Sequence, residues 1–232
     1  MPARRSFEIY LLRHGHSTAN GKGILAGRDN SVALSEKGNE QALAAADFLT
    51  ETKFSQIISS PIFRCQETLY PLLESLASRK VQPEHRLDDR LAEMDYGDWS
   101  GKKLALLSKK PLWKDIQSRP STVRFPNGES FAEMNSRTAD LISSLSESSG
   151  DRFLLCSHGD VIKAIIAAAL GLHLDQFQRI VIDPASISRI QITVSGALVR
   201  SVNDTSFHPK EKVGTKSRRS SSKFLLGGGA GK

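Results

Sequence analysis

The chain has 232 residues, a net charge of +7 and a mean hydropathy of -0.30, values typical of an ordinary soluble protein with enough length for one α/β domain. No apolar run approaches the roughly 18 residues of a membrane-spanning helix. The residues after Met1 also lack the apolar stretch of a signal peptide, so we expect no membrane partner. The two cysteines, Cys65 and Cys156, lie inside predicted elements, which indicates reduced thiols and a cytoplasmic location.

The N-terminal half of the chain alternates between predicted strands and helices. Phe7–Leu12 predicts a buried strand, and the Gly-, Asn- and Ser-rich stretch over 13–34 predicts a loop long enough to be functional. Ser35 is the expected cap of a helix whose apolar residues recur at helical spacing. Gln56–Ser59 predicts a second strand, and Pro61 suits the first position of a helix that reaches about residue 77.

An irregular stretch is expected over 83–101. Short helices interrupted by Pro111 and Pro120 follow it. Ser130 and Glu133 then form a capping-box pattern at the start of a longer helix.

The last predicted elements complete the sheet. Arg152–Ser157 predicts a strand, and Asp160 is the expected cap of the helix Val161–Leu170. Residues 186–194 and 197–203 predict an antiparallel hairpin. This order of elements predicts a three-layer α/β/α sandwich with a mostly parallel sheet and an antiparallel edge.

The positive charge is concentrated at the C-terminus. Residues 208–232 contain seven Lys and Arg against Glu211 alone, so this tail accounts for +6 of the total of +7. Lys, Ser and Gly dominate the tail, and such a composition cannot bury a core. We therefore predict a domain over 1–207 and a disordered tail over 208–232. Because the basic balance belongs to the tail, we expect no nucleic-acid partner for the domain.

Two short motifs place a histidine directly before a glycine at the end of a predicted strand. They are His14-Gly15 and His158-Gly159. Open α/β sheets bind their ligands at the carboxyl ends of the strands, and glycine lets the backbone turn and a ligand approach there. Arg13 precedes the first motif, and a Gly-rich loop follows it. This combination indicates a phosphate site built around a nucleophilic histidine.

The segment Leu12-Arg13-His14-Gly15-His16-Ser17-Thr18-Ala19-Asn20 resembles the Arg-His-Gly signature of the histidine phosphatase superfamily, phosphoglycerate-mutase-like branch. The likeness continues in the family's order over roughly residues 7–205, through Gly27, Leu34–Gly38, Ser59–Thr68, Leu91–Glu93, Tyr96–Trp99, Asn127–Ser130 and Ser157–Gly159. It is greatest for an actinobacterial-type subgroup. The resemblance implies phosphoryl-group chemistry that needs no cofactor, with a small-molecule phosphate ester as partner.

The residue types also fit this chemistry. Phosphoryl transfer needs a nucleophile in line with the leaving oxygen and positive donors around the other phosphoryl oxygens. A neutral imidazole at His14 can attack phosphorus, and Arg13 and Arg64 can each present a planar fork of N–H donors. A protonated His158 would add a third cationic donor, and Asn20 a neutral one. The resemblance implies that these five residues bind the phosphoryl group and that His14 becomes phosphorylated.

The leaving oxygen also needs a proton, and the family places its general acid at Glu93. That role requires a carboxyl group kept protonated near neutral pH by burial or by the phosphate charge. Two alternatives remain open, in which Glu93 pairs with Arg90 or Arg64, or Asp160 is the acid instead of a helix cap.

Further residues complete the predicted site. Gly27 and Gly159 are expected to bring backbone amides near the phosphate, and Arg28 is expected to contact the substrate. No Cys/His spacing suits a metal ion, so we expect no metal and no other cofactor.

The sequence favours hydrolysis over the mutase reaction. A mutase must protect its phosphohistidine from water and hold a second substrate with a carboxylate. Family mutases carry a longer insertion before the second His-Gly and a hydroxyl residue before the loop glycine. Here Ala26 takes that place, and only 64 residues separate Glu93 from His158. We predict a phosphomonoesterase, with a mutase or a non-catalytic scaffold that binds phosphorylated ligands as alternatives.

The sequence does not identify the physiological substrate or the oligomeric state. The predicted specificity segment, about residues 100–128, is basic. Its charge suits anionic sugar phosphates or nucleotides, and surface solubility explains it equally well.

Overall fold

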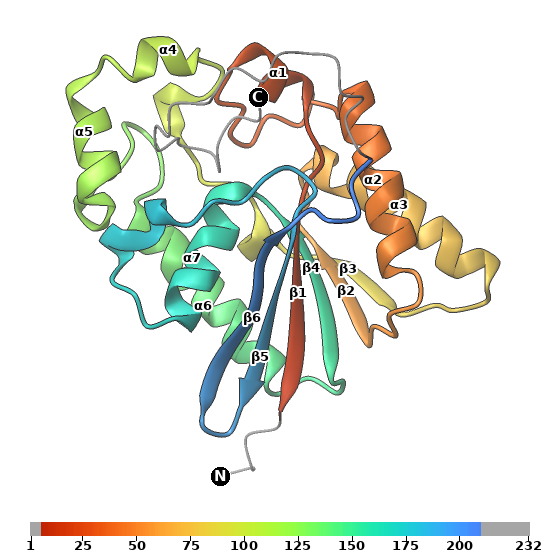
Figure 1. Ribbon diagram of the computed structural model, residues 1–232. Helices are drawn as coiled ribbons and strands as arrows, with labels where there is room; N and C mark the ends of the chain where they lie inside the picture. The colour runs from red at the N-terminus through yellow and green to blue at the C-terminus, as the bar shows by residue number, and fades with distance from the viewer. Residues whose placement is uncertain (1–5, 210–232) are drawn as a thin grey trace.

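The computed structural model describes residues 6–209, in which a six-stranded sheet runs in the order β3-β2-β4-β1-β5-β6 (Figure 1). The strands are β1 (Phe7–Arg13), β2 (Gln56–Ser59), β3 (Glu84–Leu87), β4 (Arg152–Ser157), β5 (Ile187–Thr193) and β6 (Gly196–Asp204). The first four strands pair in parallel, whereas β5 pairs antiparallel with β1, and β6 with β5. The predicted mostly parallel sheet with an antiparallel edge is therefore confirmed.

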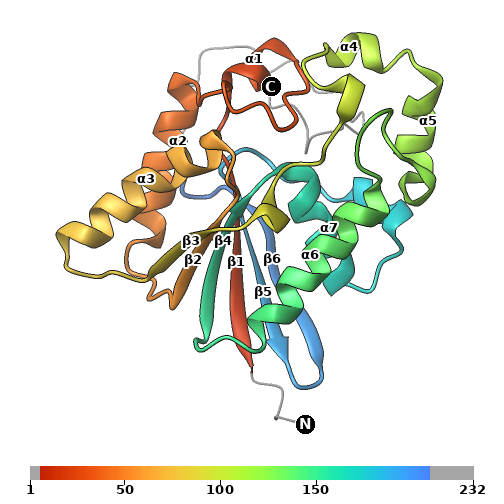
Figure 2. The ribbon, with the colours of Figure 1, turned by 180° about the vertical axis from the view of Figure 1, so that it is seen from behind.

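Helices cover both faces of this sheet. They are α1 (Thr18–Lys22), α2 (Glu36–Leu49), α3 (Phe63–Ser78), α4 (Leu104–Leu107), α5 (Pro111–Ser118), α6 (Phe131–Leu145) and α7 (Gly159–Ala169), with the 3-10 turns η1 (Asp89–Leu91), η2 (Gly97–Trp99), η3 (Pro120–Thr122) and η4 (Leu174–Arg179). Helices α2 and α3 lie on one face, and α6 and α7 lie on the other (Figures 1 and 2). No helix in the described range is both long and apolar enough to cross a bilayer.

The core is divided by the sheet into two clusters. Ile9 and Leu11 of β1 belong to the cluster under α6 and α7, whereas Tyr10 and Leu12 belong to the cluster under α2 and α3. Because successive residues of a strand point to opposite faces, a strand buried on both faces is apolar without alternation. This explains why β1 was recognisable as a buried strand from its sequence.

Most predicted elements are confirmed, but two were missed. Residues 13–34 contain the short helix α1, and the stretch over 83–101 contains the strand β3. Helix α1 has five residues, too few for an apolar period, and its capping box joins Ser17 to Asn20. Strand β3 lies at the sheet edge with mostly exposed side chains, so it carries no apolar pattern.

Two predicted helix starts were wrong. Helix α3 begins at Phe63 with Ile62 in the cap position, so Pro61 lies outside it. Helix α7 begins at Gly159 with His158 in the cap position. Asp160 is therefore the second residue of α7 rather than its cap, and its side chain is completely buried.

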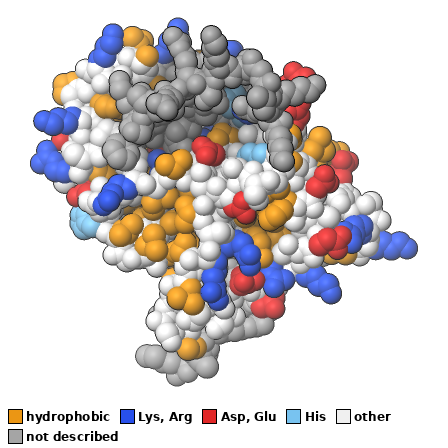
Figure 3. Space-filling view, in the orientation of Figure 1, with side chains coloured by type: hydrophobic (Ala, Val, Ile, Leu, Met, Phe, Trp, Pro, Cys, Tyr) orange, Lys and Arg blue, Asp and Glu red, His pale blue; other side chains and the backbone are white. Residues whose placement is uncertain are grey.

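The surface carries both signs of charge. In the view of Figure 3, Lys and Arg side chains are spread over the domain among acidic ones rather than gathered in one field. The described residues end just after the last strand, where Phe207 stacks on Phe48 of α2 at 4.6 Å between ring centroids. The predicted tail from residue 210 onward lies outside the described residues.

Candidate active site

The two histidines lie side by side at the carboxyl edge of the sheet. Strands β1 and β4 are neighbours whose last residues, Arg13 and Ser157, are paired in register. The next residue of each strand is a histidine, and the rings of His14 and His158 are 5.2 Å apart between centroids. Both side chains are buried. Helix α3 brings Arg64 to the same edge, so the predicted catalytic residues come together in space.

The ring of His14 is held in one tautomer. Its Nδ1 lies 2.7 Å from the carbonyl oxygen of Gly15. Because a carbonyl oxygen only accepts hydrogen bonds, Nδ1 carries the proton and Nε2 keeps its lone pair. Burial, together with the charges of Arg64 and Arg13, lowers the pKa of His14 well below its usual value. The imidazole is therefore neutral at neutral pH, the form that a nucleophile needs.

The loop that carries His14 packs very closely on the start of α2. A side chain at Gly15 would place its Cβ 2.7 Å from the carbonyl oxygen of Gly38. A Cβ at Gly38 would in turn overlap the carbonyl oxygen of His16. Two glycines are therefore required at this crossing, one on each segment. The Gly15 amide donates to the hydroxyl of Thr68 at 2.9 Å, which fixes the loop from the side of α3.

Backbone carbonyls orient the two arginines. Arg13 Nη1 donates to the carbonyl oxygen of Ile182 at 2.6 Å. Arg64 Nη2 donates to the carbonyl oxygen of Gly27 at 2.8 Å and lies 3.0 Å from Nδ1 of His158. Gly27 has a φ of 57°, the left-handed region that favours glycine. Both guanidinium groups are almost completely buried, so their charge acts in a poorly screened environment.

The structure corrects the predicted charge of His158. Its Nδ1 accepts from Arg64, so Nε2 carries the proton and donates to Ser60 Oγ at 2.8 Å. Burial is the first cause that lowers the pKa of His158 well below its usual value, and the charge of Arg64 is the second. The ring is therefore neutral here, not the cation that we expected. Ser60, which orients it, was not singled out in the sequence.

Glu93 has the properties of a proton donor. Its carboxyl group is buried, with Oε1 accepting from the Met94 amide at 3.0 Å and Oε2 4.0 Å from Nδ1 of His158. Burial, followed by the charge of Asp160, raises the pKa of Glu93 from 4.5 to about 7. A substantial fraction therefore keeps its proton at neutral pH. The guanidinium group of Arg90 binds the carboxylate of Asp88 rather than Glu93.

The side chain of Asp160 belongs to a polar network behind Glu93. Its Oδ2 accepts from the hydroxyl of Tyr96 at 2.8 Å, and its Oδ1 lies 3.4 Å from Nζ of Lys163. Lys163 also donates to Gln178 Oε1 at 3.0 Å. All four side chains are buried. Asp160 does not line the pocket described next, which favours Glu93 as the acid.

A pocket opens at the carboxyl edge of the sheet among these groups. It is lined by Arg13, His14, Ser17, Asn20, Ile24, Leu25, Ala26, Gly27, Arg64, Glu93, Tyr96 and Leu104. Three predicted site residues do not line it, namely His158, which lies behind His14 and Arg64, and the substrate candidates Arg28 and Gly159. Arg28 donates from Nε to the carbonyl oxygen of Glu93 at 2.8 Å, and Gly159 is the buried first residue of α7. Asn20 does line the pocket, although its Oδ1 is engaged by the amide and hydroxyl of Ser17.

One wall of the pocket is apolar, and the sequence did not indicate it. It consists of Ile24, Leu25 and Leu104. Backbone hydrogen bonds join residues 23–25 to residues 101–104. The amide of Leu25 donates to the carbonyl oxygen of Lys102, that of Gly101 to Leu25, and that of Leu104 to Gly23. This pairing between distant segments has no periodic pattern from which it could have been predicted.

Comparison with known proteins settles the family. The family model described as "Histidine phosphatase superfamily (branch 1)" matches residues 9–205, nearly the whole described chain. The chain belongs to this superfamily. The family prediction made from the His-Gly motifs is thus confirmed, and the protein is an enzyme of the histidine phosphatase type.

Curated relatives of this histidine phosphatase carry both phosphatase and mutase names. It is 32% identical over 187 residues to "Putative phosphoserine phosphatase 2" of Hydrogenobacter thermophilus, covering 79% of this chain and 89% of the relative. It is 29% identical over 207 residues to "Probable phosphoglycerate mutase GpmB" of Erwinia tasmaniensis, covering 86% of this chain and 94% of the relative.

Solved structures similar to this histidine phosphatase include named phosphatases. A mycobacterial glucosyl-3-phosphoglycerate phosphatase superposes with a TM-score of 0.74 at 26% identity, covering 86% of this chain and 99% of that one. The alpha-ribazole phosphatase of Shigella flexneri superposes with a TM-score of 0.75 at 25% identity, covering 85% of this chain and 96% of that one.

Proposed function

We propose that this histidine phosphatase hydrolyses small phosphomonoesters through a phosphohistidine on His14. One observation carries the proposal. The Nδ1 proton of His14 is held by the Gly15 carbonyl, and the pocket joins this ring to Arg13, Arg64 and a protonated Glu93. A neutral nucleophile, two forked cations and an acid are the groups that phosphoryl transfer from an ester requires.

The first step transfers the phosphoryl group to the enzyme. The lone pair on His14 Nε2 forms a bond to phosphorus while the bond from phosphorus to the ester oxygen breaks. The carboxyl group of Glu93 gives its proton to that oxygen, so the product leaves as a neutral alcohol. Arg13 and Arg64 stabilise the charge on the three remaining oxygens.

The second step returns the enzyme to its starting state. Water attacks phosphorus, the P–N bond breaks, and its electron pair returns to Nε2 of His14. Glu93, now a carboxylate, accepts the proton that water loses, and inorganic phosphate leaves. The protonation of Glu93 is thus restored within one turnover.

We propose that His158 changes its protonation state when a phosphoryl group is present. Negative charge beside a histidine raises its pKa, so a bound phosphoryl dianion would favour a proton on Nδ1. A protonated Nδ1 can no longer accept from Arg64. That change would free one arm of Arg64 for the phosphoryl oxygens and turn His158 itself into a donor.

The pocket supports hydrolysis over a mutase reaction. Ile24, Leu25 and Leu104 form the wall beside the phosphate groups, and Ala26 offers no hydroxyl. None of the basic residues of segment 100–128 lines this pocket. Arg119 and Arg124 instead pair with Asp115 and Glu133. Among the described residues, Arg13 and Arg64 are the only Lys or Arg that line the pocket, and both are assigned to the phosphoryl group, so we propose esters whose atoms next to the phosphate are uncharged. The mutase-named relatives keep phosphoglycerate transfer as the second candidate.

The remaining expectations are retained as proposals. A cytoplasmic location is supported by Cys65 and Cys156, which are free and buried, as is typical of proteins from reducing compartments. We also propose that residues 1–207 form the catalytic domain, that residues 208–232 are dispensable for hydrolysis, and that the enzyme needs no metal and binds no nucleic acid.

Trapping the intermediate tests the mechanism. Enzyme that turns over a ³²P-labelled phosphomonoester is quenched in acid or in alkali. The P–N bond is acid-labile, so protein-bound label should survive only the alkaline quench. His14→Ala should abolish both label and hydrolysis, whereas His173→Ala, a change at the exposed histidine that caps η4, should change neither. EDTA should have no effect.

The same experiment separates the three candidate functions. A phosphatase releases inorganic phosphate from several monoesters, a mutase transfers the label to an acceptor, and a scaffold does neither. Hydrolysis that survives in His14→Ala, or label that maps to another residue, contradicts the phosphohistidine mechanism.

A further inference from the structure

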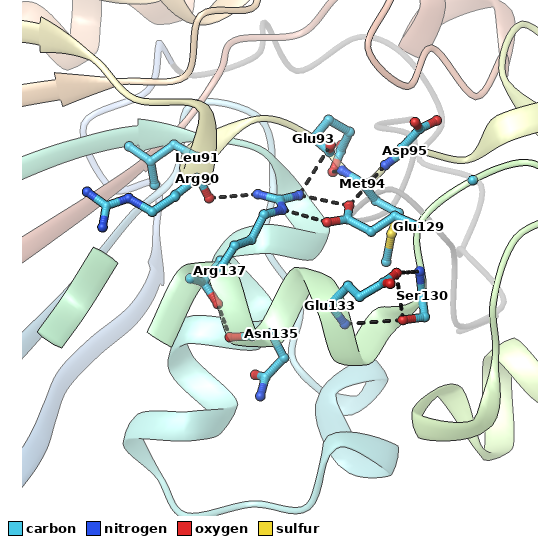
Figure 4. A network of polar contacts seen from close by, with 12 residues as sticks. Arg90, Leu91, Glu93, Met94, Asp95, Glu129, Ser130, Glu133, Asn135 and Arg137 are labelled. Atoms are coloured by element: carbon cyan, nitrogen blue, oxygen red, sulfur yellow. Dashed lines mark hydrogen bonds and ion pairs between the residues drawn. The ribbon is translucent and has the colours of Figure 1, made fainter. Parts of the chain in front are cut away.

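The general acid lies on a loop without regular structure. Glu93 lies between the turns η1 and η2, and we call residues 90–95, which begin within η1, the acid loop. Without regular backbone hydrogen bonds around Glu93, contacts from other segments must hold its carboxyl group in one position. Figure 4 shows that the acid loop is bonded to the side chains of Arg137 in α6 and of Glu129 just before α6.

Two arginines from different parts of the chain bind the acid loop. Arg137 of α6 donates from Nη1 to the carbonyl oxygen of Arg90 at 2.6 Å and from Nη2 to that of Glu93 at 3.3 Å. Arg28, which follows the loop glycine, donates from Nε to the same Glu93 carbonyl at 2.8 Å. The backbone of the general acid therefore receives two charge-assisted hydrogen bonds, which are stronger than neutral ones.

Glu129 orients both arginines. Its carboxylate accepts from Arg137 Nε at 2.7 Å and from Arg137 Nη2 at 3.1 Å, a bidentate pair. It also accepts from Arg28 Nη2 at 3.2 Å and from the Asp95 amide at 3.2 Å. The side chains of Glu129 and Arg137 are only 12% and 17% exposed, so water screens this pair little. The acid loop is thus fixed at the carbonyls of 90 and 93 and the amide of 95.

The same segment also binds the phosphate-site arginine. Arg64 donates to the carbonyl oxygen of Gly27, and the next residue, Arg28, donates to the carbonyl oxygen of Glu93. Two consecutive residues therefore connect a phosphate-binding guanidinium with the backbone of the acid.

We propose that Arg137 and Arg28, oriented by Glu129, are positioning residues that hold the carboxyl group of Glu93 at the leaving oxygen. This inference rests on the proposed role of Glu93 as general acid. It reassigns Arg28, which the sequence suggested as a substrate contact. The side chain of Arg28 does not line the pocket, and its Nε and Nη2 are bound to the acid loop and Glu129.

Proton donation depends on placement and on the leaving group, and this gives the inference a specific signature. An alkyl phosphate has a basic leaving oxygen and needs the acid, whereas p-nitrophenyl phosphate leaves as a stable anion. A displaced Glu93 should therefore slow phosphoryl transfer to His14 from the first substrate only. The later attack of water on the phosphohistidine also uses Glu93 and is shared by both substrates, so the comparison is made on kcat/KM, which reports the phosphoryl-transfer step alone. A lost substrate contact would raise KM for both, and a general loss of folded enzyme would lower kcat for both.

The experiment compares Arg28→Gln, Arg137→Gln and Glu93→Gln on an alkyl phosphate and on p-nitrophenyl phosphate. Glu93→Gln sets the scale, because it removes the proton itself. We expect Arg28→Gln and Arg137→Gln to lower kcat/KM on the alkyl phosphate by about tenfold, a part of the 10²- to 10⁴-fold that a general acid typically contributes. Their kcat/KM on p-nitrophenyl phosphate should change less than about twofold.

The control is Arg79→Gln. Like Arg28, Arg79 is a partly exposed arginine paired with a glutamate. Its side chain is 45% exposed and pairs with Glu51, whereas that of Arg28 is 42% exposed and pairs with Glu129. Arg79 makes no bond to the acid loop. It should leave both rates unchanged. When combined with Glu93→Gln, each arginine variant should cause no further loss of activity on the alkyl phosphate, because the acid that the arginine positions is already gone.

The outcomes separate this inference from the proposed function. If Glu93→Gln shows no preference between the two substrates, the acid assignment itself fails. Glu93→Gln can slow the alkyl phosphate selectively while Arg28→Gln and Arg137→Gln slow both substrates equally or change neither. In that case the positioning role is overturned while the mechanism stands. Should Arg137→Gln fail to fold, the half-exposed Arg28 decides the question alone.

Discussion

Replacing Glu93 with Gln should stabilise the protein at alkaline pH while it removes the acid. The carboxyl group of Glu93 is buried, and its pKa rises from 4.5 to about 7. The folded state therefore binds this proton more tightly than the unfolded chain does. Stability falls as the pH rises from about 4.5 to about 7 and then levels off, because the folded state must ionise a buried group.

The size of the effect follows from the two pKa values. Their difference corresponds to about 3 kcal/mol of preference for the protonated form in the folded state. Between pH 5 and pH 8 the wild type should lose about 2 to 3 kcal/mol of unfolding free energy through this one residue. Gln keeps an oxygen for the Met94 amide and cannot ionise, so Glu93→Gln should escape that loss.

Urea unfolding of both proteins at pH 5, 6, 7 and 8 measures this directly. Other titrating groups are shared, so they cancel in the difference between variant and wild type. We expect that difference to move in favour of Glu93→Gln by about 2 to 3 kcal/mol from pH 5 to pH 8. A difference that stays constant with pH would refute the raised pKa, and with it the idea that burial keeps Glu93 protonated for catalysis.

Three further predictions follow from the site and the tail. Asp160→Asn removes the charge that is the second cause of the raised pKa of Glu93, so the alkaline limb of the pH profile of kcat on an alkyl phosphate should move to lower pH; an unmoved limb contradicts this. Gly38→Ala should lower kcat on any monoester by more than about tenfold, because its Cβ would overlap the His16 carbonyl, whereas Gly21→Ala, whose nearest neighbour is a side chain at 3.4 Å, should be tolerated. Truncation after Phe207, which keeps the stacking on Phe48, should leave kcat/KM nearly unchanged; a large loss would show that the tail completes the domain.

The motif-bearing parts of the fold were predictable because their chemistry is local. A strand buried on both faces is apolar throughout, and His-Gly at its end places the imidazole at the ligand-binding edge. This was enough to bring His14 and His158 together, whereas Arg64 was assigned to the site through the family resemblance. The capping box of Ser130 and Glu133 is equally local, and the structure confirms it.

The missed features depend on contacts between segments that are distant in sequence. Asp160 suits a helix cap by position, but Tyr96, 64 residues earlier, turns its carboxylate inward. The neutral ring of His158 results from burial beside Arg64, which no spacing shows. Arg28 follows a loop glycine in the manner of a substrate contact, yet it reaches the backbone of Glu93, 65 residues away.

The position of β1 in the sheet has a consequence for how the protein is made. This strand is translated well before both of its partners, β4 and β5, which come only after residue 151. His14 also needs the later segment, because its amide and carbonyl bond to Ser157 and Ala185. A nascent chain must therefore keep an apolar strand unpaired while more than 130 further residues are synthesised, a state prone to aggregation. The nucleophile is translated long before the segment that completes and activates its site.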